Sequence, residues 1–215
     1  MSNLANILVE KGYTVLDRSF YDRTDVTKIA RDLLGKIIVT NFDGQFTAGR
    51  IVETEAYNGA VDKASHAYGN RRTARTEVMF GEPGTAYVYL CYGIHHLFNV
   101  VTNKAGTPHA VLVRALEPIH GIEIMLDRTR KQVLDNTLTR GPGNVSKALG
   151  IFTSHTGLDL MESDVRIVQD QFKVKKSAIG ITTRIGVDYA GPDAFLPYRF
   201  IVSGNPYVSG SKNRK

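Results

Sequence analysis

Three strand-like segments follow one another in the middle of the chain, and the turns between them are too short to contain a helix. Residues 85–91, 97–103 and 110–115 are rich in β-branched and aromatic side chains, which is typical of strands. Tyr92-Gly93 and residues 104–108 supply the turns. Parallel neighbours would need a crossover of about a dozen residues or more. The segments therefore predict hairpins and an α+β fold with a mainly antiparallel sheet.

The rest of the chain fits the same fold class. Apolar residues at helical spacing predict helices over residues 25–34, from Pro118 through Leu126, and after Gly141-Pro142-Gly143. Further strands are predicted at residues 36–40, 46–55, 164–168, 182–187 and 198–202, with a turn at Asp43-Gly44. Strands in adjacent pairs, with few helices between them, favour one antiparallel sheet flanked by helices.

Length and composition fit one globular domain. The chain has 215 residues, of which 42% are hydrophobic and 22% charged, close to average for soluble domains. No apolar run approaches the roughly 20 residues of a membrane span, and the N-terminus lacks the features of a secretory signal. We therefore predict an intracellular protein with one domain over residues 1–215, in which residues 209–215 form a frayed basic tail.

The charge balance favours an anionic partner. Lys and Arg number 27 against 21 Asp and Glu, a net charge of +6, which favours nucleic acid first and phosphorylated metabolites second. Cys91 is the single cysteine, so an internal disulfide and a Cys-based zinc site are excluded. The six histidines show no metal-binding spacing, and no glycine-rich nucleotide motif occurs. The sequence predicts no metal and no cofactor.

Two acidic residues stand near the end of a predicted strand. Glu53 and Glu55 are two positions apart, so their side chains point to the same face of a strand. Carboxylates close together resist simultaneous ionisation, which is one way to prepare a general base near neutral pH. The alternative interpretation is a solvent-facing strand end with ordinary surface acids.

Tyrosines and arginines are concentrated in one stretch. These residues are Tyr57, Tyr68, Arg71, Arg72, Arg75, Tyr87, Tyr89 and Tyr92. Aromatic rings that stack on bases, beside arginines that hold phosphates, are typical of a base-reading nucleic-acid site. The alternative is a tyrosine-rich strand packed in a core, which we favour for Tyr87. For Tyr92, beside Gly93 at a hairpin tip, we favour a side chain that wedges into nucleic acid.

Several motifs, in order along the chain, resemble the alkyladenine (3-methyladenine) DNA glycosylases. They are TKIARDLLGKIIV, RIVETEAYNGAVDKASHAYGNRRTARTEVMFGEPGTAYVYLCYGIHHLFNVVT, HAVLVRALEP, GPGNVSKALGI and RIGVDYAGPDAFLPYRFIV, and the resemblance covers about residues 20–208. Members of this family excise alkylated and deaminated purines from DNA, without a metal or an organic cofactor. The resemblance implies base-excision repair of lesions such as 3-methyladenine, hypoxanthine or ethenoadenine.

The resemblance also assigns catalytic roles. Glu55 matches the general base, Arg114 an arginine that helps to hold the attacking water, and Ile185 a position whose main-chain carbonyl contacts that water. A carboxylate stabilises the oxocarbenium character that develops on the sugar while it deprotonates water. Glu53 acquires no role from the resemblance. No lysine in these motifs is placed as a nucleophile, so a monofunctional enzyme that leaves an abasic site is expected.

Other residues match the family's base pocket. Tyr57, His66 and Tyr89 correspond to side chains that sandwich and hydrogen-bond the flipped base. Asn99 corresponds to a residue that crowds the exocyclic amine of guanine. An enzyme that acts on a base must extrude it from the stack, which is cheapest for a damaged, weakly paired base.

The DNA interface is the last implication of the resemblance. Tyr92 matches the side chain that wedges into the minor groove, and Arg71 and Thr73 fall on a loop near the DNA. The expected fold is a curved sheet with a protruding hairpin that enters the minor groove, and the expected partner of this monomer is damaged double-stranded DNA. The alternative function is a non-enzymatic damaged-DNA or RNA-binding protein on the same scaffold, against which Glu55 and Arg114 argue.

Overall fold

Strand β3 (Gln45–Tyr57) is the longest strand and joins two parts of the sheet. In the computed structural model, which describes residues 4–210, its first half pairs with β2 (Ile37–Phe42). Its second half pairs with β9 (Arg199–Val202), and β6 (His109–His120) follows its other side. The β3–β6 ladder contains irregularities near Gly49 and Glu53. Because bulges bend and twist a strand, they curve the sheet.

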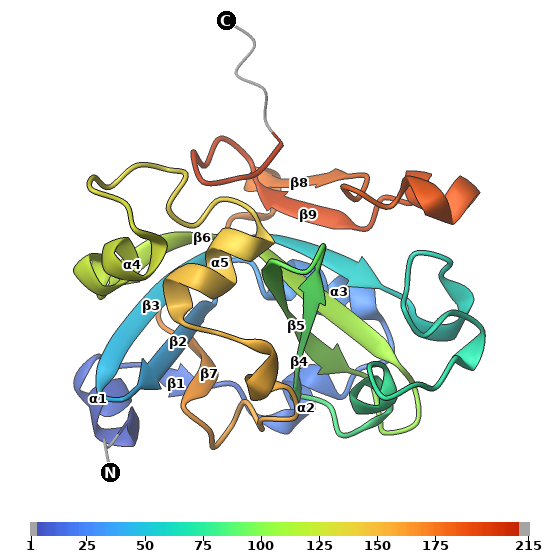
Figure 1. The fold of residues 1–215 in the computed structure, drawn as a ribbon, viewed down its shortest axis with the longest axis horizontal. Helices are drawn as coiled ribbons and strands as arrows, with labels where there is room; N and C mark the ends of the chain where they lie inside the picture. Colours follow the sequence, from blue (N-terminus) through green and yellow to red (C-terminus); the bar gives the residue numbers. More distant parts are fainter. Residues whose placement is uncertain (1–3, 211–215) are drawn as a thin grey trace, which may run out of the picture.

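The described residues form one antiparallel sheet. Its order is β1-β7-β2-β3-β6-β5-β4, with β9 beside β3 and β8 beside β9. The remaining strands are β1 (Thr14–Val15), β4 (Ala86–Cys91), β5 (His95–Thr102), β7 (Val165–Gln169) and β8 (Ile179–Thr182). In Figure 1, β8 and β9 run along the upper side of the sheet.

Short helices flank this sheet, and α5 crosses in front of its middle in Figure 1. The α-helices are α1 (Leu4–Glu10), α2 (Arg18–Tyr21), α3 (Val26–Asp32), α4 (Ile122–Thr129) and α5 (Pro142–Leu149). The 3-10 helices are η1 (Gly59–Val61), η2 (Tyr68–Asn70), η3 (Glu77–Phe80), η4 (Thr153–His155), η5 (Lys176–Ala178) and η6 (Asp188–Phe195). The predicted α+β fold, a curved and mainly antiparallel sheet flanked by helices, is confirmed.

Local sequence explains the helix that the spacing predicted over residues 25–34. The Asp25 side chain accepts hydrogen bonds from the main-chain N–H groups of Thr27 and Lys28 and so caps α3. The chain leaves the helix before Gly35, whose φ of 84° favours glycine. Helix α5 likewise begins with Pro142, in the first turn where a missing N–H costs no hydrogen bond.

Two hairpins have their turns at the positions that the sequence predicts. Asp43 and Gly44 have φ values of 51° and 77°, and Tyr92 and Gly93 have 51° and 74°. Positive φ at both central residues is the type I′ geometry that suits the twist of paired strands. The second turn joins β4 to β5 and leaves the Tyr92 side chain 90% exposed. The prediction that this hairpin enters a minor groove remains a prediction.

The predicted helix start at Pro118 is wrong. Pro118 lies within β6 and pairs with Gly49 of β3, whereas β5 pairs with β6 only as far as Leu112. No β5 residue therefore faces Pro118. Because proline has no main-chain N–H to donate, it fits where β5 needs no hydrogen bond from β6. Helix α4 begins instead at Ile122, after Gly121, which has a φ of 71°.

The strand predicted over residues 182–187 is also wrong. Strand β8 ends at Thr182, and the following residues leave the sheet. Long-range contacts hold this segment instead: the main-chain N–H of Ile185 bonds to the Glu55 carboxylate and not to the main chain of a neighbouring strand, and the buried guanidinium of Arg184 bonds to Asp62.

The two faces of the sheet have different neighbours. Val88, Phe98 and Val100 belong to the main core cluster, together with residues of α3 and α5. Because side chains alternate along a strand, Tyr89 and Asn99 point to the other face, where both line a cavity. Alternation thus separates the packed core from the face that carries the predicted site.

The chain end is ordered further than predicted. Ser209 is buried, and its N–H donates to the Glu53 carboxylate at 2.6 Å. The prediction of a frayed tail is therefore wrong at Ser209, and residues 211–215 lie outside the described residues. No helix within residues 4–210 is long and apolar enough to cross a membrane.

We predict that Gly121→Ala destabilises the protein by about 2–5 kcal/mol, because it combines left-handed backbone strain with overpacking. A Cβ at this position would collide with the main-chain oxygen of Phe46 and with Thr47. Gly106→Ala is the matched control, since Gly106 has a φ of 89° and open space around it, and it should cost only about 1–2 kcal/mol. Equal losses in urea unfolding would contradict the packing argument.

Candidate active site

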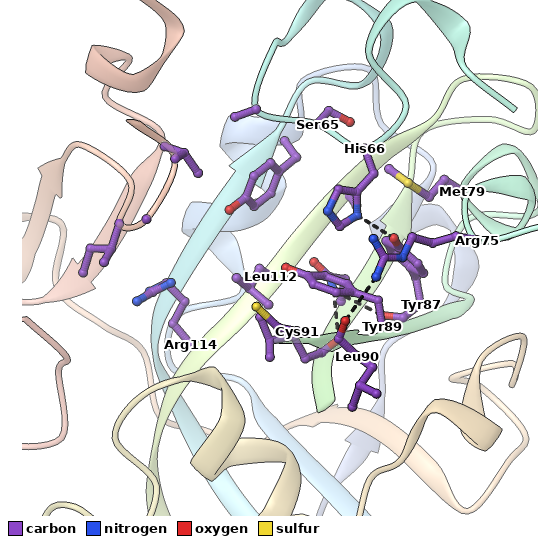
Figure 2. A pocket seen from close by; sticks show the side chains of 18 of the residues that line it. Ser65, His66, Arg75, Met79, Tyr87, Tyr89, Leu90, Cys91, Leu112 and Arg114 are labelled. Atoms are coloured by element: carbon purple, nitrogen blue, oxygen red, sulfur yellow. Dashed lines mark hydrogen bonds between the residues drawn. The ribbon is translucent and has the colours of Figure 1, made fainter. Parts of the chain in front are cut away.

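A cavity of about 330 Å³ opens beside strands β3, β4, β5 and β6 and beside the loop that follows β8. Its volume lies within the range of small-molecule sites. Seven of the predicted site residues line it, namely Tyr57, His66, Tyr89, Tyr92, Asn99, Arg114 and Ile185. Figure 2 shows His66, Tyr87 and Tyr89 grouped together, with Arg114 on the opposite side.

The Glu55 carboxylate lies behind this lining and is fully buried. One oxygen, Oε2, accepts a hydrogen bond from the Tyr57 hydroxyl at 2.8 Å. The other, Oε1, accepts from the main-chain N–H of Ile185 at 2.8 Å and lies 3.3 Å from Nε of Arg114. Three of the predicted site residues therefore hold Glu55 in place.

The surroundings of Glu55 oppose its ionisation. Burial raises the pKa of Glu55 and outweighs the lowering effects of Arg114, the Ile185 N–H and the Tyr57 hydroxyl. The nearby Glu53 carboxylate raises this pKa further. A buried carboxylate with a raised pKa, in contact with three residues that line a cavity, is a candidate general base.

The interpretation of Glu53 and Glu55 as ordinary surface acids is wrong. At these two residues, β3 is covered by β6 on one side and β9 on the other. The prediction that both side chains share a face is confirmed, because Nε of Arg114 is 2.9 Å from Glu53 and 3.3 Å from Glu55. Burial alone would lower the pKa of Arg114, but the two carboxylates raise it.

The aromatic side chains of the cavity are uncharged near neutral pH, and the Arg75 guanidinium lies beside them, 5.5 Å from the centroid of the Tyr89 ring. The ring of His66 meets the ring of Tyr89 edge-on, with centroids 4.6 Å apart, and its Nδ1 is 2.7 Å from the Tyr87 hydroxyl. Burial, together with the charge of Arg75, lowers the pKa of His66 to about 4. Tyr87 is buried in a core cluster, which confirms its predicted packing role.

Asn99 is fixed in orientation. Its side-chain amide donates to the main-chain oxygens of Tyr87 and Leu97, at 3.2 and 3.1 Å. The side chain is buried and lies in the wall of the cavity. Such a group can restrict the shape of a bound ring, because moving it would break two hydrogen bonds.

The residues predicted to contact DNA lie at the rim. Tyr92 is almost fully exposed, so core packing is excluded for this residue. Arg71 and Thr73 line a neighbouring cavity of about 470 Å³ that shares His66 and Arg75 with the first. Their contact with DNA remains a prediction.

One buried ion pair near the site was missed by the sequence analysis. Arg184 donates to both carboxylate oxygens of Asp62, at 2.5 and 2.9 Å, and both side chains are buried. Asp62 also accepts from the main-chain N–H groups of Asn58 and Ala64. The pair connects the loop before His66 with the segment of Ile185. The two residues are 122 positions apart, so no local pattern could have linked them.

No group of three or more His, Cys, Asp or Glu residues that could hold a metal ion occurs within residues 4–210.

The site consists of a buried carboxylate beneath an aromatic cavity, on one face of a curved antiparallel sheet. Comparison of the sequence with known families identifies the family to which the chain belongs. The model of the Methylpurine-DNA glycosylase family matches residues 19–206. The chain belongs to this family. The predicted resemblance is confirmed.

Similar proteins each carry the name "Putative 3-methyladenine DNA glycosylase". The protein of Alkaliphilus oremlandii is 44% identical over 203 residues, which cover 90% of this chain and 98% of the relative. That of Bacillus cereus strain G9842 is 47% identical over 199 residues, covering 89% and 97%. That of Desulfitobacterium hafniense is 43% identical over 205 residues, covering 90% and 98%.

We predict that Asp62→Ala lowers the free energy of unfolding by about 3–5 kcal/mol, because it leaves the buried Arg184 charge unpaired. The matched control is Glu77→Gln, which breaks an ion pair with Arg72 in which both side chains are more than half exposed. That change should cost less than about 1 kcal/mol. Urea unfolding of both variants tests the prediction, and a small loss for Asp62→Ala would contradict it.

Proposed function

We propose that this protein is a monofunctional DNA glycosylase that removes alkylated purines, 3-methyladenine in particular, from double-stranded DNA. The observation that carries the proposal is the Glu55 carboxylate, buried with a raised pKa beside Arg114 beneath an aromatic cavity. Family membership and the names of the relatives support the same activity. Hypoxanthine and ethenoadenine are further candidate substrates.

The cavity suits a purine that has been flipped out of the duplex. Tyr57 and Tyr89 offer ring faces or edges to a base, and stacking on aromatic side chains is worth about 1–3 kcal/mol per base. An alkylated purine is cationic, and aromatic faces attract cations. His66 is neutral near pH 7 because burial lowers its pKa to about 4, so it does not repel a cationic base.

In the proposed reaction, water attacks C1′ of the sugar while the N-glycosidic bond breaks and its electron pair leaves with the purine. Glu55 accepts a proton from the water and stabilises the positive charge on the sugar. Arg114 and the main-chain carbonyl of Ile185 orient the water. The cavity lining within the described residues includes no lysine. This supports attack by water and an abasic site as the product.

Tyr92 provides the proposed wedge. It stands at the tip of the β4–β5 hairpin and borders the cavity, so it can fill the gap that a flipped nucleotide leaves in the stack. Arg71 and Thr73 lie nearby, and the net charge of +6 favours phosphate contacts. The proposed working form is a monomer on duplex DNA.

We predict that Glu55→Gln slows single-turnover excision by about 10²–10⁴-fold, because it removes the base while keeping the shape. Affinity for lesion DNA should survive, since stacking and phosphate contacts are unchanged. Abasic-site formation on duplexes containing 3-methyladenine, hypoxanthine or ethenoadenine is the measurement. The control is Glu117→Gln, an exposed acid on the neighbouring strand β6. Binding without excision by the unmodified protein would instead favour the non-enzymatic alternative.

We predict that Tyr92→Ala weakens excision of paired lesions and leaves thermal stability unchanged, because the side chain is exposed and makes no core contact. Excision from single strands, where no gap must be filled, should change much less. Val133→Ala, an exposed apolar residue outside the cavity lining, is the control. A large fall in melting temperature for Tyr92→Ala would identify a packing role instead.

We predict that Asn99→Ser raises excision of guanine-type bases relative to adenine-type bases, because it shortens a rigidly held side chain in the cavity wall. The ratio of the two rates, measured on matched duplexes, is the readout. An unchanged ratio would show that selectivity arises elsewhere.

A further inference from the structure

A second carboxylate lies next to the catalytic candidate and has no assigned role. Glu53 is fully buried. Its Oε1 accepts hydrogen bonds from Nε of Arg114 at 2.9 Å, Nε of Arg199 at 2.7 Å and Oγ of Ser209 at 2.8 Å. Its Oε2 accepts from the N–H of Ser209 at 2.6 Å. Both oxygens act as acceptors, which is the behaviour of the ionised form.

These residues form one electrostatic group with Glu55. We name Glu53, Arg114, Arg199 and Ser209 the Glu53 cluster. Together with Glu55 it contains two carboxylates and two guanidinium groups, so the formal charges cancel. All of these side chains are buried, and an unpaired charge in such a place is strongly destabilising.

Arg114 is divided between the two carboxylates. Its Nε is closer to Glu53 than to Glu55, at 2.9 against 3.3 Å, and its Nη2 is 3.3 Å from Oγ of Ser209. Arg199 lies opposite Glu55 in the β3–β9 register, but its Nε bonds to Glu53. Glu53 thus shares Arg114 with Glu55 and receives the Arg199 hydrogen bond, although Arg199 lies opposite Glu55 in the sheet.

We propose that Glu53 is a positioning residue for the reaction, which holds Arg114 between two carboxylates and so keeps Glu55 basic. The C-terminal segment at Ser209 completes this arrangement. The role of Glu53 in catalysis rests on the proposed function. The effect of Glu53 on the proton affinity of Glu55 does not, because it can be measured without any reaction.

Other titratable and charged groups also face Glu55, and Glu53→Gln leaves all of them in place. They are Tyr57 on β3, Tyr89 on β4, Arg114 on β6, Arg199 on β9, and Arg184 and Tyr189 after β8. Glu53 is the neighbouring carboxylate that raises the pKa of Glu55. Arg114, the Ile185 N–H and the Tyr57 hydroxyl act in the opposite direction.

The test is a titration of the Glu55 carboxyl carbon by NMR in the full-length protein, assigned by comparison with Glu55→Gln. In Glu53→Gln, Arg114 pairs with Glu55 alone, and the pKa of Glu55 should fall by about one unit or more. In Arg199→Gln, Glu53 draws Arg114 more strongly, and the pKa of Glu55 should rise. Glu117→Gln should leave it unchanged.

Kinetics provide the second readout. General-base catalysis requires the ionised carboxylate, so the rate falls as the pH drops through the pKa of Glu55. In Glu53→Gln this acid limb should move to lower pH by the shift seen in the titration. The rate on the plateau should fall about tenfold because a weaker base is less effective, with affinity for lesion DNA retained.

A purely structural role predicts a different pattern. Glu53→Gln would then lower the melting temperature and leave the pKa of Glu55 unchanged, which would overturn the proposal. If a single variant does not fold, Glu53→Gln combined with Arg199→Gln removes one charge of each sign and avoids an unpaired one. The pKa of Glu55 should again fall below that of the unmodified protein.

The unmodified protein gives a test that does not depend on variants. A Glu55 carboxyl that titrates at or below the usual value for glutamate would also overturn the proposal. A shifted titration with no excision of any lesion would sink the proposed function and leave the electrostatic inference intact. The two failures are therefore distinguishable.

Discussion

The burial of two carboxylates on a central strand is the constraint on which this structure depends. Taking a charged group out of water costs several kcal/mol even after relaxation. The fold offsets this cost for Glu53 and Glu55 with Arg114 from β6 and Arg199 from β9. The order of the strands around β3 is thus tied to the site, because β6 and β9, which flank β3 at these two residues, each supply one guanidinium group.

Segments outside the sheet are held in place by hydrogen bonds to Glu53 and Glu55 and by the ion pair between Arg184 and Asp62. The N–H of Ile185 bonds to Glu55, and its neighbour Arg184 bonds to Asp62. Ser209, near the chain end, bonds to Glu53. Three loops that are distant in sequence are therefore anchored through charged hydrogen bonds. Such anchoring favours a preformed site, which a general base needs if it is to meet water in a fixed geometry.

The features predicted from the sequence are those that depend on local chemistry. Asp43-Gly44 forms a type I′ turn because both residues accept a positive φ, and Asp25 caps α3 through its own side chain. The features that were missed depend on distant partners. Ser209 is ordered because it meets Glu53, 156 positions earlier. Pro118 fits inside β6 because β5 does not extend to it.

The candidate site was predictable to a different extent. From their spacing alone, Glu53 and Glu55 could be either ordinary surface acids or a prepared general base. The reason is that periodicity does not reveal that β3 pairs with β2 in its first half and with β9 in its second half. The resemblance to a family selected Glu55, and the structure places Arg114, Tyr57 and Ile185 around it. The resemblance assigned no role to Glu53, because the partners of its carboxylate come from distant parts of the sequence.

The chemistry of the cavity gives a reason for the proposed substrate class. Breaking a glycosidic bond to a neutral purine benefits from protonation of the leaving base, whereas a cationic alkylated purine leaves without it. Burial lowers the pKa of His66 to about 4 and raises those of Tyr57 and Tyr89. None of these groups is a strong proton donor near pH 7. In the proposed reaction, a single general base without a strong proton donor therefore gives its greatest advantage to purines that already carry a positive charge.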